Sequence, residues 1–540
     1  MTVSTEEFDY VVVGGGTAGC VLAARLSEDP DVTVLLLEDG PADTLPTLRD
    51  ARLGSVLSLW GDPAVSRVHR SVPQPGLLGR EIDIPQGRVL GGGSSINALL
   101  HVWGHPLDYA DWDPQGKEGW SYPDLLPYFQ RAETYRPGAV PVRAGAGPAG
   151  DARGLKGPLG VVGLQAPAEV STAFIRAVAG WPSAGGVVAD HNTKPDPGSG
   201  FYYQSAREPG GVQRSSAASG YLAPASGRPN LSVRTAARAT RLLFEADRAA
   251  EVEYAHEPGR AESRILRRTR ARREILVCCG ALATPGLLAR SGVGPAEQLR
   301  ELGLPVLADL PGVGQGLQDH LLFGVGYGST RALPDSELLA EAGLFLRSGI
   351  GDAGGPPDLQ FFFGPVQFVP DAYRADGPGF TLAPVLLHPA SRGEVRIASA
   401  DPFADPIVDP RYLSAEQDLA VLVRGLELAR ELIARPELDG FRGPELAPGT
   451  GVVARAGLED YVRRYASTVW HPVGTARMGA DPDAADEPAV VGFDLAVHGV
   501  RGLRVVDASV MPSLPSGNTN AATVAIAERA AALIRGTHGA

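Results

Sequence analysis

The first glycines of the chain have the spacing of a phosphate-binding turn, G-x-G-x-x-G, in the run Gly14-Gly15-Gly16-Thr17-Ala18-Gly19. Gly14 permits a tight turn, Gly16 lets the backbone approach a pyrophosphate, and Gly19 lets a helix pack closely on a strand. Free N–H groups at the helix start, those of Thr17 and Ala18 among them, attract phosphate. Glu38 follows Gly19 by nineteen residues and can accept hydrogen bonds from ribose hydroxyls. These residues predict a dinucleotide site.

The segments around this turn are typical of the elements that such a site needs. Residues 8–13 form an apolar run of strand type, residues 20–27 are typical of a helix, and residues 32–37 of a second buried strand that ends at Glu38. Without these flanks the glycine string is a weak signal, because Gly-rich turns that bind no ligand are common. The order strand, turn, helix, strand and acid therefore predicts an α/β dinucleotide-binding domain. The alternative is a bare turn in another α/β protein.

A second glycine cluster lies at residues 87–97, where Gly91, Gly92 and Gly93 are followed by two serines. Successive glycines let backbone amides come very close to a flat or anionic group. The alternative for this run alone is a Gly-rich turn before a helix.

Composition excludes several other classes. The 540 residues carry a net charge of -13, which argues against nucleic acid or an anionic membrane surface as partner. Three cysteines give no disulfide framework and no metal-ligand spacing, and no apolar run reaches transmembrane length. The first strand starts too early to leave room for a signal peptide. We therefore expect a cytoplasmic protein, a monomer or homodimer, without a metal site.

Six runs, in family order, resemble the signatures of the glucose–methanol–choline (GMC) oxidoreductases. They are GRVLGGGSSIN at 87–97, GALATPGLLARSGVG at 280–294, PGVGQGLQDH at 311–320, WHPVGT at 470–475, GLRVVDAS at 502–509 and NTN at 518–520. The resemblance implies an α/β fold with a Rossmann-like FAD-binding domain and a second, α+β substrate-binding domain, both discontinuous in sequence. The implied limits are 1–157, 213–319 and 465–540 for the first domain, and 158–212 and 320–464 for the second.

The resemblance also decides between two dinucleotides. NAD is the competing ligand of a G-x-G-x-x-G turn, but this family uses that turn for the ADP half of FAD. The further FAD contacts that it implies are Arg88, Gly91, Gly92, Ser95, Asn97, Val233, Gly280, Asp507, Ala508 and Asn520.

Oxidation of an alcohol removes a hydroxyl proton and a carbon-bound hydride, and the hydride needs a cofactor. The protein must supply a base and a donor to the developing oxyanion, and neutral imidazole suits the first role. By resemblance His471 is the catalytic base facing flavin N5, and Asn518 holds the substrate oxygen. An arbitrary histidine is more often structural, and the resemblance implies that structural role for His320.

Two departures from choline oxidase, a family member, shape the prediction. That enzyme links its flavin through a histidine where this chain has Ile96, so we expect dissociable FAD. Leu321-Leu322-Phe323 replaces its substrate-binding glutamate, which disfavours choline. An apolar pocket lined by Trp60, Phe323, Phe362 and Trp470 would suit an aromatic or medium-chain primary alcohol. The alternative is that most of these aromatic residues are sheet core. We expect residues 137–160, with Arg153-Gly154, to form an exposed loop.

The expected activity is FAD-dependent oxidation of a primary alcohol to the aldehyde, or onward to the acid, with O2 as electron acceptor. It resembles the bacterial 5-hydroxymethylfurfural and aryl-alcohol oxidases of the family. One alternative is a dehydrogenase that acts on a sugar or amino-sugar alcohol in secondary metabolism. A hydroxynitrile lyase, a photodecarboxylase and a flavin-binding protein without turnover are less favoured.

Overall fold

The computed structural model describes residues 6–138, 152–195, 197–256 and 265–538. It has a mixed α/β fold built on two large sheets, each with its own hydrophobic core. The α/β class predicted from the sequence is confirmed. No helix among these residues combines the length and apolar character needed to cross a bilayer.

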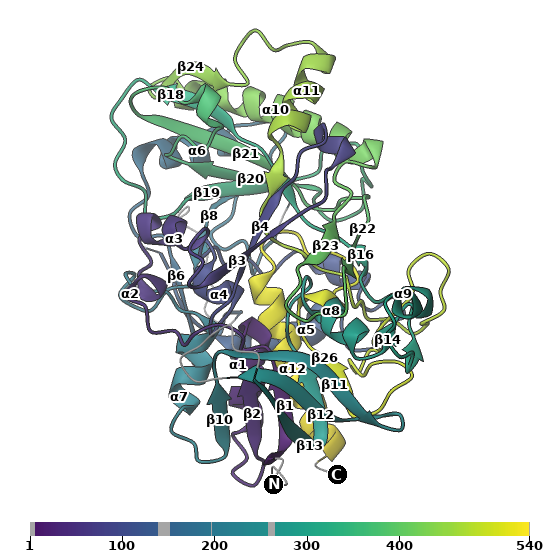
Figure 1. Cartoon of the computed structure of the whole chain (residues 1–540). Helices are drawn as coiled ribbons and strands as arrows, with labels where there is room; N and C mark the ends of the chain where they lie inside the picture. The colour runs from purple at the N-terminus through teal and green to yellow at the C-terminus, as the bar shows by residue number, and fades with distance from the viewer. Residues whose placement is uncertain (1–5, 139–151, 196, 257–264, 539–540) are drawn as a thin grey trace.

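The first sheet has seven strands and lies in the lower part of Figure 1. Its order is β10 (Leu231–Arg234), β2 (Val34–Leu37), β1 (Glu6–Val13), β13 (Leu266–Val277), β12 (Arg248–His256) and β11 (Ala237–Glu245), with β26 (Leu503–Val505) paired to β13. The parallel strands β10, β2, β1, β13 and β26 meet at one carboxyl edge. Tyr10 to Val13 are buried because helices cover the sheet, and the apolar run predicted at 8–13 is confirmed as a strand.

Helices α1 (Thr17–Leu26) and α12 (Asn520–His538) pack on each other beside this sheet, although they begin 503 residues apart in the sequence. Figure 1 shows the purple α1 next to the yellow α12, with both chain ends at the foot of the molecule. Arg25 and Glu528 join the two helices through a 2.6 Å ion pair. The carboxyl edge of the sheet therefore faces two helix N-termini.

The second sheet has nine strands and lies in the upper part of the molecule (Figure 1). Its order is β24 (Arg442–Ala447), β18 (Val325–Ser329), β21 (Gly379–Leu386), β20 (Leu359–Gly364), β19 (Ala342–Leu346), β8 (Ser199–Tyr202) and β7 (Gly186–Val187). The two-residue strand β17 (Leu321–Leu322) pairs with β21, and β25 (Ser467–Thr468) pairs with β17. Helices α6 (Glu169–Ala179) and α10 (Glu416–Ile433) pack against this sheet.

Smaller elements surround the two sheets. They are α2 (Pro46–Arg49), α3 (Leu53–Leu59), β3 (Ser66–Arg70), β4 (Asp83–Gly87), α4 (Gly93–Ile96), α5 (Tyr122–Ala132), β5 (Glu133–Arg136), β6 (Leu159–Gly163), β9 (Gln204–Ser205), α7 (Ala223–Ala225), α8 (Thr284–Arg290), β14 (Val293–Gly294), α9 (Ala296–Glu301), β15 (Ala308–Asp309), β16 (Gln315–Leu317), β22 (Gly393–Ile397), β23 (Pro406–Asp409) and α11 (Arg455–Tyr465). The domain limits given above stay a prediction.

The expectation of an exposed loop at 137–160 is wrong at Arg153, while residues 139–151 lie outside the described part. The Arg153 side chain is fully buried between the carboxylates of Glu133 and Asp190 and over the ring of Tyr135. A buried guanidinium needs such partners because burial of an unpaired charge is very costly.

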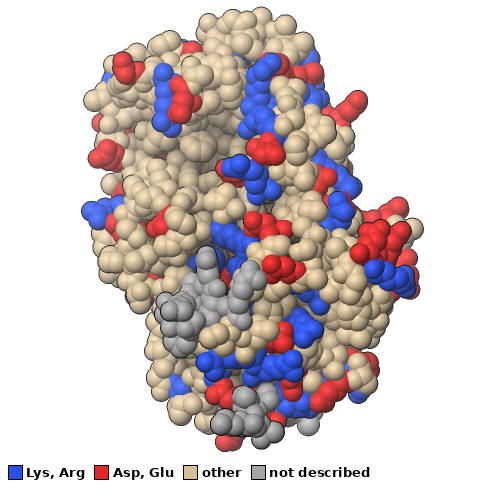
Figure 2. All heavy atoms as spheres, viewed as in Figure 1, with Lys and Arg blue, Asp and Glu red and all other residues tan. Residues whose placement is uncertain are grey.

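On the face drawn in Figure 2, basic and acidic side chains are interspersed rather than gathered by sign. Many of them form ion pairs, such as Arg67 with Asp405 at 2.5 Å. This face therefore presents no broad field of one charge.

Candidate active site

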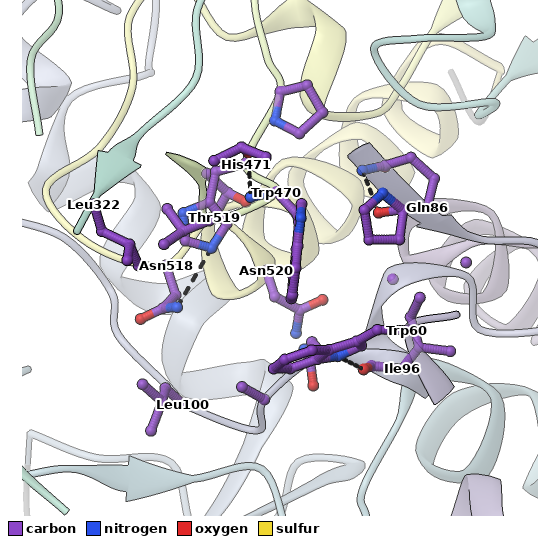
Figure 3. A pocket seen from close by; sticks show the side chains of 18 of the residues that line it. Trp60, Gln86, Ile96, Leu100, Leu322, Trp470, His471, Asn518, Thr519 and Asn520 are labelled. Atoms are coloured by element: carbon purple, nitrogen blue, oxygen red, sulfur yellow. Dashed lines mark hydrogen bonds between the residues drawn. The ribbon is translucent and has the colours of Figure 1, made fainter. Parts of the chain in front are cut away.

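One cavity of about 510 Å³ runs from the glycine turn before α1 to His471 and Asn518. Figure 3 shows these two side chains pointing toward each other, with Trp60 and Trp470 nearby. The predicted site residues that line the cavity are Gly16, Thr17, Ala18, Trp60, Gly92, Asn97, Gly280, Phe323, Phe362, Trp470, His471, Asp507, Ala508, Asn518 and Asn520.

Close backbone approaches form the nucleotide end of this cavity. Gly14 has a φ of +102°, and a Cβ there would lie 2.4 Å from the Cys278 carbonyl oxygen. A Cβ on Gly19 would lie 1.9 Å from the Gly14 oxygen, and one on Gly92 would lie 2.7 Å from Gly16 Cα. The two glycine clusters thus pack against each other, and any side chain would separate them.

Glu38 lies behind the turn rather than in the cavity wall. Its carboxylate accepts hydrogen bonds from the N–H groups of Gly15 at 2.8 Å and Gly40 at 2.7 Å. Burial raises the pKa of Glu38 to about 7.

Several other predicted cofactor residues also lie outside the cavity lining. Gly91 donates its N–H to the Gly15 oxygen at 2.7 Å, and the Ser95 hydroxyl donates to Leu90 O at 2.8 Å. Arg88 pairs with Asp39 at 3.0 Å, and Val233 is a half-exposed residue of β10. In this arrangement Gly91 and Ser95 shape the glycine loop.

The flavin-signature residue Asn97 has its amide fixed. Its Oδ1 accepts hydrogen bonds from Arg214 Nη1 at 2.7 Å and from Leu99 N at 3.1 Å. The Asn97 amide N–H groups therefore remain for a ligand in the cavity.

Asp507 joins the ends of two strands of the first sheet. It follows β26, and its carboxylate accepts hydrogen bonds from Gly280 N and Thr284 Oγ1, which follow β13.

His471 follows β25 in a turn whose backbone is held by one carboxylate. Trp470 has a φ of +62°, which is unusual for a bulky residue, and donates its N–H to Thr468 Oγ1 at 2.7 Å. The next N–H, that of His471, donates to Asp319 Oδ1 at 2.8 Å. Tyr412 and Thr468 donate their hydroxyls to the other oxygen of Asp319.

The imidazole of His471 lies between a second histidine and an amide. Its Nδ1 is 2.9 Å from His320 Nδ1, and its Nε2 is 3.4 Å from Asn518 Nδ2. Burial lowers the pKa of His471 to about 4, so the ring is neutral at neutral pH and can accept a proton. The buried Asn518 Oδ1 has no hydrogen-bond partner within the described part of the chain.

Sequence reasoning did not place Asp319 and His320 in the site, yet both contact His471. The available signal was their adjacency in the Gln318-Asp319-His320 motif. The structural role implied for His320 left its contact with the base unpredicted, because that contact depends on the pairing of β17 with β25.

The substrate end of the cavity has apolar walls. Trp60 and Trp470 meet edge to face with ring centroids 4.3 Å apart, and Trp60 Nε1 donates to Ile96 O. Phe362 faces the cavity, whereas Phe361 and Phe363 point into the core on the other side of β20. Phe323 touches the cavity but is itself almost fully buried. Among the described lining residues the only carboxylate is Asp507, and it is engaged at the nucleotide end.

Family models for the N- and C-terminal parts of a GMC oxidoreductase match residues 8–322 and 389–527. The chain belongs to the GMC oxidoreductase family. An oxygen-dependent choline dehydrogenase from Pseudomonas savastanoi is 36% identical, over 98% of this chain and 94% of the relative. The crystal structure of pyridoxine 4-oxidase from Mesorbium loti is 35% identical with a TM-score of 0.88 and covers 99% of both chains. An FAD-dependent oxidoreductase from Chaetomium thermophilum is 27% identical with a TM-score of 0.86, over 98% and 100% of the two chains.

These findings confirm the family, the fold and the reaction class predicted from the motifs. The chain is an FAD-dependent GMC oxidoreductase that acts on CH–OH groups. The cavity fits the cofactor, because glycine backbones meet at one end, the Asn97 amide N–H groups remain available to a ligand, and the buried Asn518 Oδ1 has no partner among the described residues.

Proposed function

We propose that this GMC oxidoreductase oxidises an uncharged primary alcohol with an aromatic or apolar body to the aldehyde. The observation that carries the proposal is the pair His471 and Asn518 at the end of an apolar cavity. A lone-pair acceptor and an amide N–H donor lie 3.4 Å apart there, so a hydroxyl oxygen beside the pair, at about 2.9 Å from each nitrogen, can interact with both.

In the proposed mechanism His471 Nε2 accepts the hydroxyl proton, and the burial that keeps the ring neutral makes it available for this task. Asn518 Nδ2 donates to the oxygen as negative charge develops on it. Asn97, held by Arg214, presents its amide N–H groups to the cofactor side. FAD, when bound, supplies the hydride acceptor that no side chain offers.

The lining supports a neutral substrate rather than choline. A positive charge buried in an apolar site needs a nearby anionic partner. Leu322 lines the cavity two residues after His320, and the carboxylate of Asp507 is engaged elsewhere. The 36% identical choline dehydrogenase therefore indicates the reaction class better than the substrate.

Three finer points belong to the same proposal. Oxygen is the proposed electron acceptor, supported by an oxygen-dependent relative and by the likeness to pyridoxine 4-oxidase. Non-covalent FAD is proposed because Ile96, which cannot form a bond to the ring, lines the cavity at the linking position. A cytoplasmic location is proposed because the three cysteines are all free thiols, as is usual in a reducing compartment.

The test is anaerobic reduction of the bound flavin by benzyl alcohol, followed in a stopped-flow spectrometer. His471→Ala should slow bleaching by about 10²–10⁴-fold, the range that general base catalysis contributes. His498→Gln is the matched control, since His498 contacts only the Gly479 carbonyl far from Asn518 in the fold. An unchanged rate in the His471 variant would refute the assignment of the base.

A further inference from the structure

A continuous line of nitrogen and oxygen atoms runs from the end of β21 into the active site. The carbonyl oxygen of Leu387 lies 2.9 Å from His320 Nε2. His320 Nδ1 lies 2.9 Å from His471 Nδ1, and the two rings stand at 84° to each other. His471 Nε2, at the far end, faces the Asn518 amide.

The chemistry of the atoms fixes where the hydrogens lie. A carbonyl oxygen only accepts hydrogen bonds, so His320 Nε2 must carry a proton. Burial lowers the pKa of His320 well below its usual range, so that ring is neutral and its Nδ1 bears a lone pair. His471 Nδ1 must then carry the proton that joins the two rings, which leaves a lone pair on Nε2.

The opposite tautomer of His471 meets a repulsive contact. A lone pair on its Nδ1 would face the lone pair of His320 Nδ1 across 2.9 Å. The proton would then lie on Nε2, where it would block acceptance of a substrate proton. This conclusion does not depend on which way the Asn518 amide is turned, because it rests on the Leu387 carbonyl and on the neutral state of the buried His320 ring.

We propose that His320 is a positioning residue that holds His471 in the Nδ1–H tautomer and so keeps the Nε2 lone pair directed at the substrate hydroxyl. The inference rests on the proposed role of His471 as the base. When His471 accepts the substrate proton it becomes an imidazolium, and His320 Nδ1 accepts a charge-assisted hydrogen bond from it. His320 therefore stabilises both the correct resting form and the charged form.

The titratable groups around the two rings are compatible with the tautomers assigned to His320 and His471. Asp319 contacts the backbone of His471, and its pKa is raised by burial to about 6. Tyr412 donates to Asp319, and burial holds the pKa of Tyr412 well above its usual range. His388 follows Leu387, with its Nε2 3.1 Å from Ser516 Oγ and 3.4 Å from Asp108, and its charge acts with burial to lower the pKa of His320.

Two variants of similar size distinguish the loss of the hydrogen-bond acceptor at His320 Nδ1 from a change in side-chain volume. His320→Asn can place a carboxamide oxygen where Nδ1 was, and so keeps an acceptor for His471. His320→Gln can reach the Leu387 carbonyl with an amide N–H but leaves His471 Nδ1 without an acceptor. We expect the Gln variant to reduce its flavin with benzyl alcohol about 10²–10⁴-fold more slowly, and the Asn variant to stay within about tenfold of the parent.

Two further measurements would not change if His320 had only a structural role. They are the pH dependence of flavin reduction and the ¹⁵N-histidine spectrum of the holoenzyme. Loss of the acceptor destabilises the imidazolium, so the acid limb of the anaerobic reduction rate should move to lower pH in the Gln variant. In the parent holoenzyme labelled with ¹⁵N-histidine, the His471 signals, identified by their absence in His471→Asn, should show Nδ1–H and unprotonated Nε2. The Gln variant should show a shift toward Nε2–H.

The proposal would be overturned if both variants lost the same amount of flavin-reduction rate and the acid limb of the pH profile stayed in place. It would also be overturned if the spectrum of the parent enzyme showed the proton on Nε2 of His471. The spectrum of the parent decides the question even if a variant fails to fold. If His471→Ala reduces flavin at the parental rate, the proposed base itself is wrong. If that variant is slow while the His320 variants are not, only the positioning role is wrong.

Discussion

Burial of the His471 ring sets the pH range in which it can act as a base. The pKa of the buried ring is lowered to about 4, so the neutral form persists well below pH 7. We expect the anaerobic reduction rate to be flat from about pH 6 upward and to fall about tenfold per pH unit once the ring is protonated. Stopped-flow rates across the pH range check this. A half-point at or above the ordinary histidine value of about 6.5 would contradict it.

Arg214 is a buried cation that orients Asn97, a proposed cofactor contact, without lining the cavity. Its Nη1 donates to Asn97 Oδ1, its Nε and Nη2 lack partners in the described part of the chain, and burial lowers its pKa to about 9. Arg214→Met should free the Asn97 amide to rotate and weaken FAD binding by roughly tenfold, the value of one lost hydrogen bond to a charged group. Titration of apoprotein with FAD measures the dissociation constant.

The exposed Arg52→Met variant is the control for Arg214, because Arg52 pairs only with Asp50 near the surface. Equal FAD affinity in the Arg214 variant and this control would show that Asn97 holds its orientation unaided.

The sequence predicted individual site residues where a short motif contains them. It did not predict contacts between site residues that lie far apart in the sequence. His471 and Asn518 were named from short runs, and the structure brings their side chains within 3.4 Å. His320 lies 151 residues before His471, and the pairing of Leu321 with Thr468 and the bond of His471 N–H to Asp319 bring them together. Periodicity carries no information about such a contact.

At the scale of elements, strands with continuous apolar runs were predictable and charged ones were not. The apolar runs at 8–13 and 32–37 correspond to β1 (Glu6–Val13) and β2 (Val34–Leu37). No apolar run marks the first half of β13 (Leu266–Val277), because that half is rich in arginines. When long charged side chains occupy the alternating positions of a strand, its sequence is polar, even though its backbone is hydrogen-bonded in the sheet.

The connection that follows β5 is held by a buried ion cluster. Arg153 contacts Glu133 at 2.6 Å and Asp190 at 2.9 Å, and no part of its side chain reaches solvent. Arg153→Met would leave two buried carboxylates without their cation. We expect this change to lower the free energy of unfolding by about 3–5 kcal/mol, the cost of breaking a buried pair.

Denaturant unfolding of the holoprotein measures the effect, with the exposed Lys156→Met variant as control. A loss of stability no larger than that of the control would mean that water reaches the two carboxylates when the arginine is removed.

For the molecule as a whole, the cavity has walls from both large sheets. Residues of β20 and of the segment after β25 close one side, and the glycine turns before α1 and α4 close the other. The family motifs predicted this general plan, because five of the six contribute residues to the cavity lining, and the sixth, at 311–320, carries Asp319 and His320, which contact His471. They did not predict the paths of the connections, which pack through pairs such as Arg67 with Asp405.

The pairing of α1 with α12 has a consequence for how the protein is made. Thr17 near the first residues and Asn520 near the last line the same cavity, and their side chains lie 3.1 Å apart. A nascent chain on the ribosome therefore lacks one wall of this cavity until α12 has emerged. Because we propose that the cavity holds the flavin, we expect flavin loading to wait for α12, and a chain that stops before residue 520 to be purified without yellow colour.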